Sequence, residues 1–185
     1  MKINKVKTAI KIGDFQLNKT ESANHIKVKY NEKIEKSILQ CNLGRVYLFT
    51  CNEKIIKIGG SSSKGGIKTT LSFYTTSMTG SPGKPRFIIH LLIRDELLNG
   101  NKCEIFMITS PLAISYVTGL FKQKKMKIAA FKEMEDFCKE DYYKLENKYP
   151  VWNFQENNDP YPQRYSIEHV KYHEKRLKKI NYNKN

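Results

Sequence analysis

The chain has 185 residues, of which 33 are Lys or Arg and 18 are Asp or Glu, so its formal net charge is +15. That length is enough for one domain with a buried core. The charge excess favours a polyanionic partner, because basic side chains that neutralise phosphates release counterions. Nucleic acid is therefore the expected partner, and a ribosome-associated role is an alternative that charge alone leaves open.

The chain shows no pattern of a membrane or secretory protein. Its N-terminus carries lysines but lacks the uninterrupted apolar segment of a signal peptide. No stretch approaches the roughly 20 apolar residues that cross a bilayer. We therefore expect a cytoplasmic protein with no membrane contact.

The N-terminal half is predicted to begin with a strand, a short helix and a hairpin. Residues 1–43 are polar and lysine-rich, with a candidate strand at Thr8–Phe15 and a short helix that Gly44 ends. Residues 45–59 predict a β-hairpin that turns at residues 51–54. The segment "IKTTLSFYTTSM" then predicts a helix, which "TGSPGKP" ends.

The C-terminal half is predicted to hold strands followed by two helices. "RFIIHLLI" predicts a buried strand, and "LLNGNKCEIFMI" predicts a second hairpin that turns at "NG". Apolar residues recur at helical spacing over residues 127–148, which predicts a helix that Pro150 ends. A final helix over residues 166–179 is strongly basic.

The first hairpin carries Tyr47 on one strand and Lys57 near the end of the other. Neighbouring antiparallel strands hold such side chains about 5 Å apart. A phenol can act as a general base toward water if a nearby cation lowers its pKa or a second group takes its proton. The pair is a candidate for phosphodiester cleavage, and an exposed Tyr–Lys pair is the ordinary structural alternative.

The stretch "KEDYYKLENKYPVWN", residues 139–153, combines acidic residues on a helix with a helix-ending proline and an asparagine. This order can bring a carboxylate and an amide to one site. A carboxylate is a natural Mg²⁺ ligand, and it commonly shares the ion with substrate phosphates and water. A helix with a charged outer face is the structural alternative here.

Taken together, "RVY" at 45–47, "KIG" at 57–59 and "EDYY…PVWN" at 140–153 resemble the motifs of the GIY-YIG nuclease superfamily, in the same order. The second motif looks like the K-I-G variant of that family. The resemblance covers about residues 44–154. It implies an α+β fold, in which a small three-stranded antiparallel sheet is flanked by helices.

The resemblance also implies how the chain is divided. Residues 44–154 would be the catalytic core, which contains an inserted β-hairpin. Residues 1–43 would be a helical N-terminal extension, and residues 155–185 would be a basic, helical C-terminal extension.

By this resemblance, Tyr47 would be the general base or would position the attacking water. Lys57 would lower the pKa of Tyr47 or contact the scissile phosphate. Glu140 would bind one Mg²⁺ (or Mn²⁺), which offsets charge on the leaving oxygen. Asn153 would hold the substrate backbone or brace the site.

The chain departs from the family pattern in its basic residues. The helix after K-I-G has no arginine where the family has one, so Lys68 or Lys64 would supply the positive charge. A lysine offers a point charge instead of a bidentate fork, so the exchange is not conservative. Arg45 stands where the first motif has a glycine.

The chain also departs in the position of the acidic residue. At 100° per residue, Glu140 falls almost opposite the apolar face of its helix, whereas Glu135 and Asp141 lie at the edges of that face. Glu135 and Asp141 are therefore alternates to Glu140 as the metal ligand.

Other residues are candidates for contact with DNA. An insertion around residues 87–120 is a candidate recognition element. His169 and His173 have the i, i+4 spacing of metal ligands, but no third ligand is evident, so we interpret them as part of a basic surface. The individual candidates for DNA contact are Arg45, Lys64, Tyr74, Arg164, Lys171, Lys175 and Arg176.

The combined interpretation is a metal-dependent endonuclease that hydrolyses phosphodiester bonds in double-stranded DNA. It resembles the small stand-alone restriction enzymes or phage nucleases of the superfamily, and we expect a sequence-specific enzyme of the type II restriction kind. A homodimer is one arrangement that would cut both strands. Two alternatives stay open: a catalytically inactive GIY-YIG-like module that binds nucleic acid, and an unrelated basic nucleic-acid-binding protein.

Overall fold

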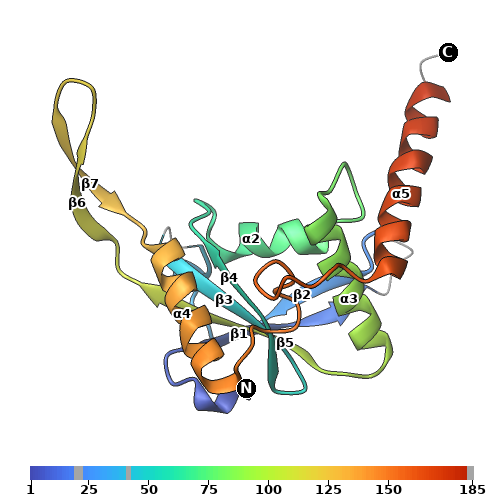
Figure 1. Ribbon diagram of the computed structural model, residues 1–185, viewed down its shortest axis with the longest axis horizontal. Coiled ribbons are helices and arrows are strands. Elements are labelled where there is room, and N and C mark those ends of the chain that lie inside the picture. The colour runs from blue at the N-terminus through green and yellow to red at the C-terminus, as the bar shows by residue number, and fades with distance from the viewer. Residues whose placement is uncertain (19–22, 41–42, 183–185) are drawn as a thin grey trace.

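The computed structural model describes residues 1–18, 23–40 and 43–182, which form a mixed α+β fold (Figure 1). Its main sheet is antiparallel and has five strands in the order β2-β1-β5-β3-β4, and β6 and β7 form a separate two-stranded ribbon. The strands are β1 (Ile10–Leu17), β2 (Ile26–Tyr30), β3 (Gly44–Cys51), β4 (Lys54–Ser61), β5 (Cys103–Ser110), β6 (Ala113–Thr118) and β7 (Gln123–Ile128). The helices are α1 (Lys36–Gln40), α2 (Gly66–Thr75), α3 (Lys84–Leu98), α4 (Phe131–Glu146) and α5 (Gln163–Tyr182).

The α+β prediction is confirmed, but the main sheet is larger than the resemblance implied. It has five strands instead of three, because β1 and β2 lie in the expected helical N-terminal extension and join the sheet next to β5. The candidate strand at Thr8–Phe15 corresponds to β1, and the short helix before Gly44 corresponds to α1. The β3–β4 hairpin consequently lies at one side of the sheet, with β4 as an edge strand.

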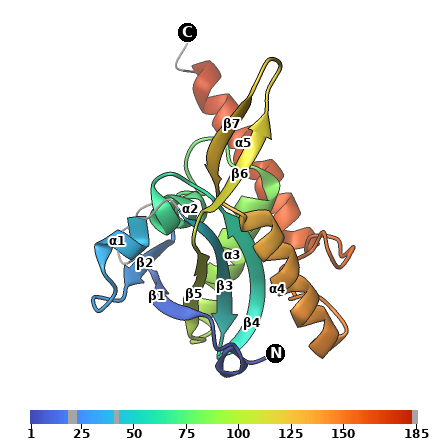
Figure 2. The same cartoon turned by 90° about the vertical axis from the view of Figure 1, so that its left-hand side faces the viewer.

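Apolar clusters lie on both faces of the sheet. α2 and α3 cover one face, whereas α4 covers the other face over β3 and β4 (Figure 2). Because alternate residues of a strand face opposite sides, β3 contributes Tyr47 and Phe49 to the first cluster and Val46 and Leu48 to the second. β3 is therefore buried on both faces, which makes it a rigid support for Tyr47.

The segment "RFIIHLLI" belongs to a helix, so the strand prediction is wrong. It lies within α3, which buries Phe87, Ile88, Ile89, His90, Leu91 and Ile93. Burial on several sides of a helix produces an unbroken apolar run, which periodicity cannot distinguish from a buried strand. The local sign of a helix is Pro85 in the first turn, where a missing N–H is tolerated.

The "NG" pair is the C-terminal cap of α3, so the predicted hairpin at this position is also wrong. Gly100 has a φ of 79°, and its N–H donates to the carbonyl of Leu97, while the Asn101 N–H donates to the carbonyl of Glu96. These are the two bonds of a Schellman motif, which ends a helix with a left-handed glycine. The residues that follow form β5, in the middle of the sheet.

The inserted hairpin lies farther along the chain, at β6 and β7. Within the described ranges these strands pair only with each other, and they project from the body of the molecule (Figures 1 and 2). Leu120 and Phe121 at the tip are 94% and 97% exposed. α5 projects on the same side, and α2 and the segment that links α4 to α5 lie between the two projections (Figure 1).

The two predicted C-terminal helices are confirmed with shifted ends. The helix expected at 127–148 is α4, which begins only at Phe131 because the preceding residues belong to β7. The helix expected at 166–179 is α5. Across the described residues, no helix has both the length and the apolar character needed to cross a membrane.

Candidate active site

The β3–β4 hairpin forms as predicted, with its turn at Asn52 and Glu53. These two residues have positive φ values of 45° and 67°, as in a type I′ hairpin turn. The pairing places Tyr47 opposite Gly59. Lys57, two positions earlier on β4, is therefore a diagonal neighbour of Tyr47, at a separation that a long side chain can bridge.

A β-bulge interrupts β4 just before Lys57. Phe49 pairs with Lys57 whereas Thr50 pairs with Ile55, so Ile56 is the extra residue. Bulges are common beside active sites, where they redirect a side chain. Here Ile56 joins the core beneath α2 and α3, and Lys57 lines a cavity.

This cavity has a volume of about 180 Å³ and lies at the outer edge of β4. Its walls come from β3, β4, α4, the first two turns of α3 and the segment that links α4 to α5. Tyr47, Lys57, Glu135, Asn153 and Glu156 all line it. Polar side chains from three separate parts of the sequence thus meet in one place.

Asn153 attaches the α4–α5 linking segment to the free edge of β4. Its side-chain oxygen accepts from the Ile58 N–H and its amide donates to the Ile58 carbonyl, both at 2.9 Å. The Trp152 N–H also donates to the Ile56 carbonyl at 2.8 Å. These bonds take the place of the partner strand that an edge strand lacks. Asn153 is 2% exposed, and its contacts fit the bracing role.

Gly60 allows α4 to approach β4 closely. A Cβ atom on Gly60 would lie 2.5 Å from Oε2 of Glu135 and 3.0 Å from the carbonyl oxygen of Phe131. A larger residue at position 60 would therefore push the first part of α4 away from the sheet. The second glycine of "KIGG" is thus the reason that Glu135 reaches the cavity.

Lys139 links the two carboxylates of the cavity. Its Nζ lies 2.7 Å from Oε1 of Glu135 and 2.5 Å from Oε1 of Glu156. Burial acts to raise the pKa of Glu156, but hydrogen bonds and the charge of Lys139 outweigh burial, so this pKa lies below its ordinary value. Two carboxylates therefore surround one cation at the wall of the cavity.

Glu135 and Glu156 are the carboxylates of the cavity that could hold a Mg²⁺ ion. Mg²⁺ is usually held by one or two carboxylates together with waters and substrate phosphates. The described part of the chain contains no group of three or more His, Cys, Asp and Glu side chains suited to a metal, so the remaining ligands would come from water and substrate. Lys139 already places a positive charge between Glu135 and Glu156, and it would have to move when a divalent ion binds there.

Tyr47 is paired with a second tyrosine, Tyr74 of α2, with 2.6 Å between their hydroxyl oxygens. Burial, followed by the effects of Tyr74 and the carboxylates of Glu135 and Glu156, raises the pKa of Tyr47 well above its ordinary value. Burial also raises the pKa of Tyr74 to about 12. The Tyr47 hydroxyl is therefore protonated at neutral pH, and the shift is opposite to the lowering that the resemblance implied.

The pKa of Lys57 shifts in the direction expected of a buried amine. Burial lowers the pKa of Lys57, although the charges of Glu156 and Glu135 act in the opposite direction. In the part of the chain that the structure describes, no hydrogen bond or ion pair holds its ammonium group. Such a lysine can contact an anion or, once deprotonated, accept a proton.

Glu140 and Asp141 do not line the cavity. Glu140 is exposed on α4, about 140° around the helix from Glu135, which faces β4. Asp141 lines a groove on another side of α4 and pairs with Lys144 at 3.9 Å. Of the three carboxylates considered from the sequence, the structure brings only Glu135 to Tyr47 and Lys57.

Two of the predicted basic residues also lie elsewhere. The Nζ atom of Lys68 lies over the ring of Tyr30, 5.1 Å from its centroid, and Lys68 does not line the cavity. Arg45 is 0% exposed, and its guanidinium donates to the carbonyl of Ser63 at 3.0 Å, so it holds the loop after β4 instead of offering a surface for DNA. Lys64 is exposed in that loop.

The sequence patterns did not indicate Glu156, which lines the cavity, or Arg86, which lies beside it. Arg86 lies in the first turn of α3, next to Pro85, which lines the cavity. Burial is the main influence on the pKa of Tyr74, and the positive charge of Arg86 acts against it. The guanidinium of Arg86 lies over the ring of Phe73, 5.2 Å from its centroid, and Arg86 does not itself line the cavity. Its charge acts on the Tyr47–Tyr74 pair, although it comes from a different helix than the family arginine. Its only local signal is the basic helix start "KPR".

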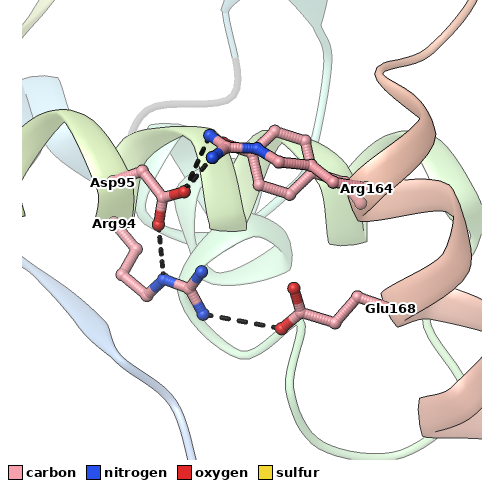
Figure 3. A network of polar contacts seen from close by, with 5 residues as sticks. Arg94, Asp95, Arg164 and Glu168 are labelled. Carbon is pink, nitrogen blue, oxygen red and sulfur yellow. Dashed lines mark hydrogen bonds and ion pairs between the residues drawn. The ribbon is translucent and has the colours of Figure 1, made fainter.

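Arg164 attaches α5 to α3. Its Nη2 lies 3.0 Å from Oδ2 of Asp95, which also accepts a hydrogen bond from the Tyr165 hydroxyl at 2.8 Å (Figure 3). Arg94 contacts the other oxygen of Asp95 at 2.7 Å. The predicted DNA contact Arg164 is thus engaged within the protein. The other candidates on this helix lie farther along it, at Lys171, Lys175 and Arg176.

No protein-family model and no curated protein matches the sequence. Two solved structures are similar in fold. A point mutant of bacteriophage T4 EndoII matches with a TM-score of 0.50 and 17% identity, over 83% of this chain and 98% of that chain. Restriction endonuclease HPY188I in complex with product DNA matches with a TM-score of 0.49 and 17% identity, over 82% of this chain and 84% of that chain. The similarity to EndoII shows a shared fold.

Proposed function

We propose that this protein is a metal-dependent DNA endonuclease of the GIY-YIG type, in the K-I-G variant. The observation that carries the proposal is the meeting of Tyr47, Lys57 and Glu135 in one cavity, with Asn153 bracing its wall. Metal-assisted phosphodiester hydrolysis uses such a set, because it combines a proton acceptor, positive charge near the phosphate and a carboxylate for the metal. The fold of EndoII, an endonuclease by its name, supports the same activity.

Lys57 is the proposed proton acceptor, and Tyr47 positions the attacking water. Burial lowers the pKa of Lys57, so its amine loses a proton more readily than an exposed lysine does. The raised pKa of Tyr47 keeps its hydroxyl protonated, which suits a hydrogen-bond donor. Arg86 replaces Lys68 in our assignment as the source of positive charge near the Tyr47–Tyr74 pair.

Glu135 replaces Glu140 as the proposed ligand of Mg²⁺ or Mn²⁺, and Glu156 is the second carboxylate. The bound ion would offset the negative charge that develops on the leaving oxygen. Lys139, which contacts both carboxylates, would then turn toward solvent or substrate.

Two basic projections are the proposed supports for double-stranded DNA. The β6–β7 hairpin and α5 rise on the same side of the molecule (Figure 1). A two-stranded ribbon fits the major groove, so the hairpin takes over the recognition role expected for residues 87–120, most of which form α3 and β5. The basic residues are Lys122, Lys124, Lys125 and Lys127 on the hairpin, and Lys171, Lys175, Arg176, Lys178 and Lys179 on α5.

We further propose sequence-specific cleavage of the type II restriction kind. One cavity per chain serves one strand at a time, so a double-strand break requires two copies or two successive encounters. A homodimer on a palindromic site would place two cavities across the duplex, because its twofold symmetry matches that of the site.

The test is a cleavage assay on plasmid and genomic DNA in Mg²⁺ and in Mn²⁺, with wild type, Glu135→Gln and Glu140→Gln. Both substitutions remove one carboxylate charge from α4, so they are matched controls for each other. We expect discrete fragments from wild type and Glu140→Gln, and at least about a hundredfold slower cleavage by Glu135→Gln.

Other outcomes would redirect the assignment. Loss of cleavage in Glu140→Gln with full activity in Glu135→Gln would overturn the proposed metal ligand. Tight, salt-sensitive DNA binding by wild type with no cleavage would favour the inactive module. Absence of both binding and cleavage would favour an unrelated function.

A further inference from the structure

α5 carries two histidines that the proposed nuclease site does not use. His169 and His173 are one helical turn apart and half-buried, and both direct Nε2 at the carbonyl oxygen of Pro82 in the α2–α3 loop. The distances to that oxygen are 3.1 Å from His169 and 3.2 Å from His173, and the two Nε2 atoms are 3.1 Å apart. The three atoms therefore form a nearly equilateral triangle.

Hydrogen bonds alone cannot satisfy this triangle. The Pro82 oxygen is an acceptor, and each imidazole Nε2 is either a donor or an acceptor, depending on its proton. If both nitrogens are donors, the His169–His173 contact joins two donors. If either nitrogen is an acceptor, its contact with Pro82 joins two acceptors. At least one of the three contacts is therefore repulsive in every protonation state, whereas a cation would be attracted to three acceptors at once.

The triangle also has the right size for a transition-metal ion. Zinc lies about 2.0–2.1 Å from an imidazole nitrogen, and the centre of this triangle is only about 1.8 Å from each corner. An ion about 1 Å above the plane of the triangle would therefore lie at bonding distance from all three atoms. The resulting donor–ion–donor angles are about 100°, which leaves room for water as further ligands.

Neighbouring rings hold the two imidazoles in place. Phe87 of α3 packs edge-on against His169 with 5.1 Å between ring centroids, and Tyr172 packs edge-on against His173 at 5.4 Å. The Tyr172 hydroxyl lies 3.0 Å from the carbonyl oxygens of both Met78 and Gly80, so α5 also contacts the same loop next to the histidines. The donors are thus preorganised by packing that does not depend on an ion.

We propose that His169, His173 and the Pro82 carbonyl bind one imidazole-preferring divalent ion, of which Zn²⁺ is the common biological example, and that this ion fastens the basic helix α5 to the α2–α3 loop. The i, i+4 spacing was visible in the sequence, but the third donor is a backbone atom more than eighty residues away. The site is chemically distinct from the cavity, because imidazole favours Zn²⁺, Co²⁺, Ni²⁺ and Cu²⁺ whereas carboxylates favour Mg²⁺ and Mn²⁺.

The experiment is a Co²⁺ titration of the full-length, metal-free protein, followed by visible absorption, together with thermal unfolding in the presence and absence of Zn²⁺. It uses a Glu135→Gln/Glu156→Gln background, so that the cavity cannot contribute the signal. On this background we expect one equivalent of Co²⁺ to bind and Zn²⁺ to raise the midpoint of unfolding. His169→Gln and His173→Gln should each weaken Co²⁺ binding at least about tenfold and remove the shift by Zn²⁺.

Glu174→Gln, an exposed change on the same helix, is the matched control and should bind as the background does. Circular dichroism verifies that each variant is folded. The proposal is overturned if folded His169→Gln and His173→Gln bind Co²⁺ as tightly as the control, or if the background protein binds no Co²⁺. Because no step depends on DNA cleavage, failure of this proposal and failure of the nuclease assignment are distinguishable.

Discussion

Gly59 lies directly opposite Tyr47 in the β3–β4 pairing, and the Tyr47 ring occupies the space that a side chain at position 59 would need. A Cβ atom on Gly59 would lie 2.9 Å from Cε2 of Tyr47 and still closer to its hydroxyl end, which is far inside van der Waals contact. The glycine of the second motif and the tyrosine of the first are therefore coupled by packing.

Gly59→Ala should displace the Tyr47 ring and break its hydrogen bond with Tyr74. Overpacking of this kind lowers the free energy of unfolding by about 1–3 kcal/mol, and DNA cleavage should fall with it. Denaturant unfolding and the plasmid assay measure the two effects. Gly83→Ala is the control, because its Cβ would lie 3.9 Å from the nearest atom. Equal stability and activity of the two variants would show that Tyr47 is placed differently.

Lys57→Arg should change how the cleavage rate depends on pH. The lowered pKa of Lys57 means that its neutral amine becomes populated at a pH below the ordinary value of 10.5. The wild-type rate should therefore rise with pH up to that pKa and then level off. An arginine keeps its charge throughout this range and cannot accept the proton, so the rise should be lost. If the cleavage rate of Lys57→Arg still rises with pH as the wild-type rate does, Lys57 is not the proton acceptor.

Arg86→Gln should slow cleavage by about a hundredfold, the effect of removing one group that stabilises developing negative charge. Arg86 lies over Phe73 and Lys68 lies over Tyr30, but it is the charge of Arg86 that acts on the Tyr47–Tyr74 pair. Lys68→Gln, which removes the same charge, should therefore cleave nearly as fast as wild type. If Lys68→Gln slows single-turnover cleavage more than Arg86→Gln does, Lys68 and not Arg86 supplies the positive charge.

Asp95→Asn should destabilise the protein in a pH-dependent way. Burial acts to raise the pKa of Asp95, but hydrogen bonds from Arg94 and Tyr165 and the charges of Arg94 and Arg164 leave it below the ordinary value of 3.8 (Figure 3). A lowered carboxyl pKa stabilises the folded state above the unfolded pKa, and that stabilisation is lost as the pH falls through the folded pKa.

At pH 7, Asp95→Asn should therefore reduce the free energy of unfolding by about 1–2 kcal/mol. The difference from wild type should shrink below about pH 4, where protonation removes the same charge. Denaturant unfolding at the two pH values measures this. Asp136→Asn, an exposed change on α4, should show no such dependence. A constant difference at both pH values would mean that the charge of Asp95 does not hold α5.

Lys124→Gln/Lys125→Gln should weaken DNA binding and reduce its salt dependence. Removal of one lysine–phosphate contact lowers the slope of log K against log salt by about 0.9. The control is Lys27→Gln/Lys29→Gln, which removes the same charge from β2, at the opposite edge of the sheet from β4. Fluorescence anisotropy at several salt concentrations measures both slopes. If the two double variants have equal slopes of log K against log salt, the hairpin does not contact the DNA backbone.

Local patterns were enough to predict several elements of this protein. The β3–β4 hairpin, α4 and α5 follow from strand, turn and helical periodicity within one segment each. The K-I-G and R-V-Y motifs identified Tyr47 and Lys57, which line one cavity because adjacent antiparallel strands bring them together. Such contacts depend on residues near one another in sequence, so the local sequence is sufficient to predict them.

Tertiary packing decided the rest. α3 is buried on several sides by elements that a local pattern does not include, so its apolar run resembled a strand. The choice of Glu135 over Glu140 depended on which face α4 turns toward β4, and that face is set by the close contact at Gly60. Glu156 joins the cavity, and the Pro82 carbonyl meets His169 and His173, across long sequence separations. The sequence alone determined which chemical groups were present, and only the folded chain determined which of them meet, because these contacts depend on how helices pack against the sheet.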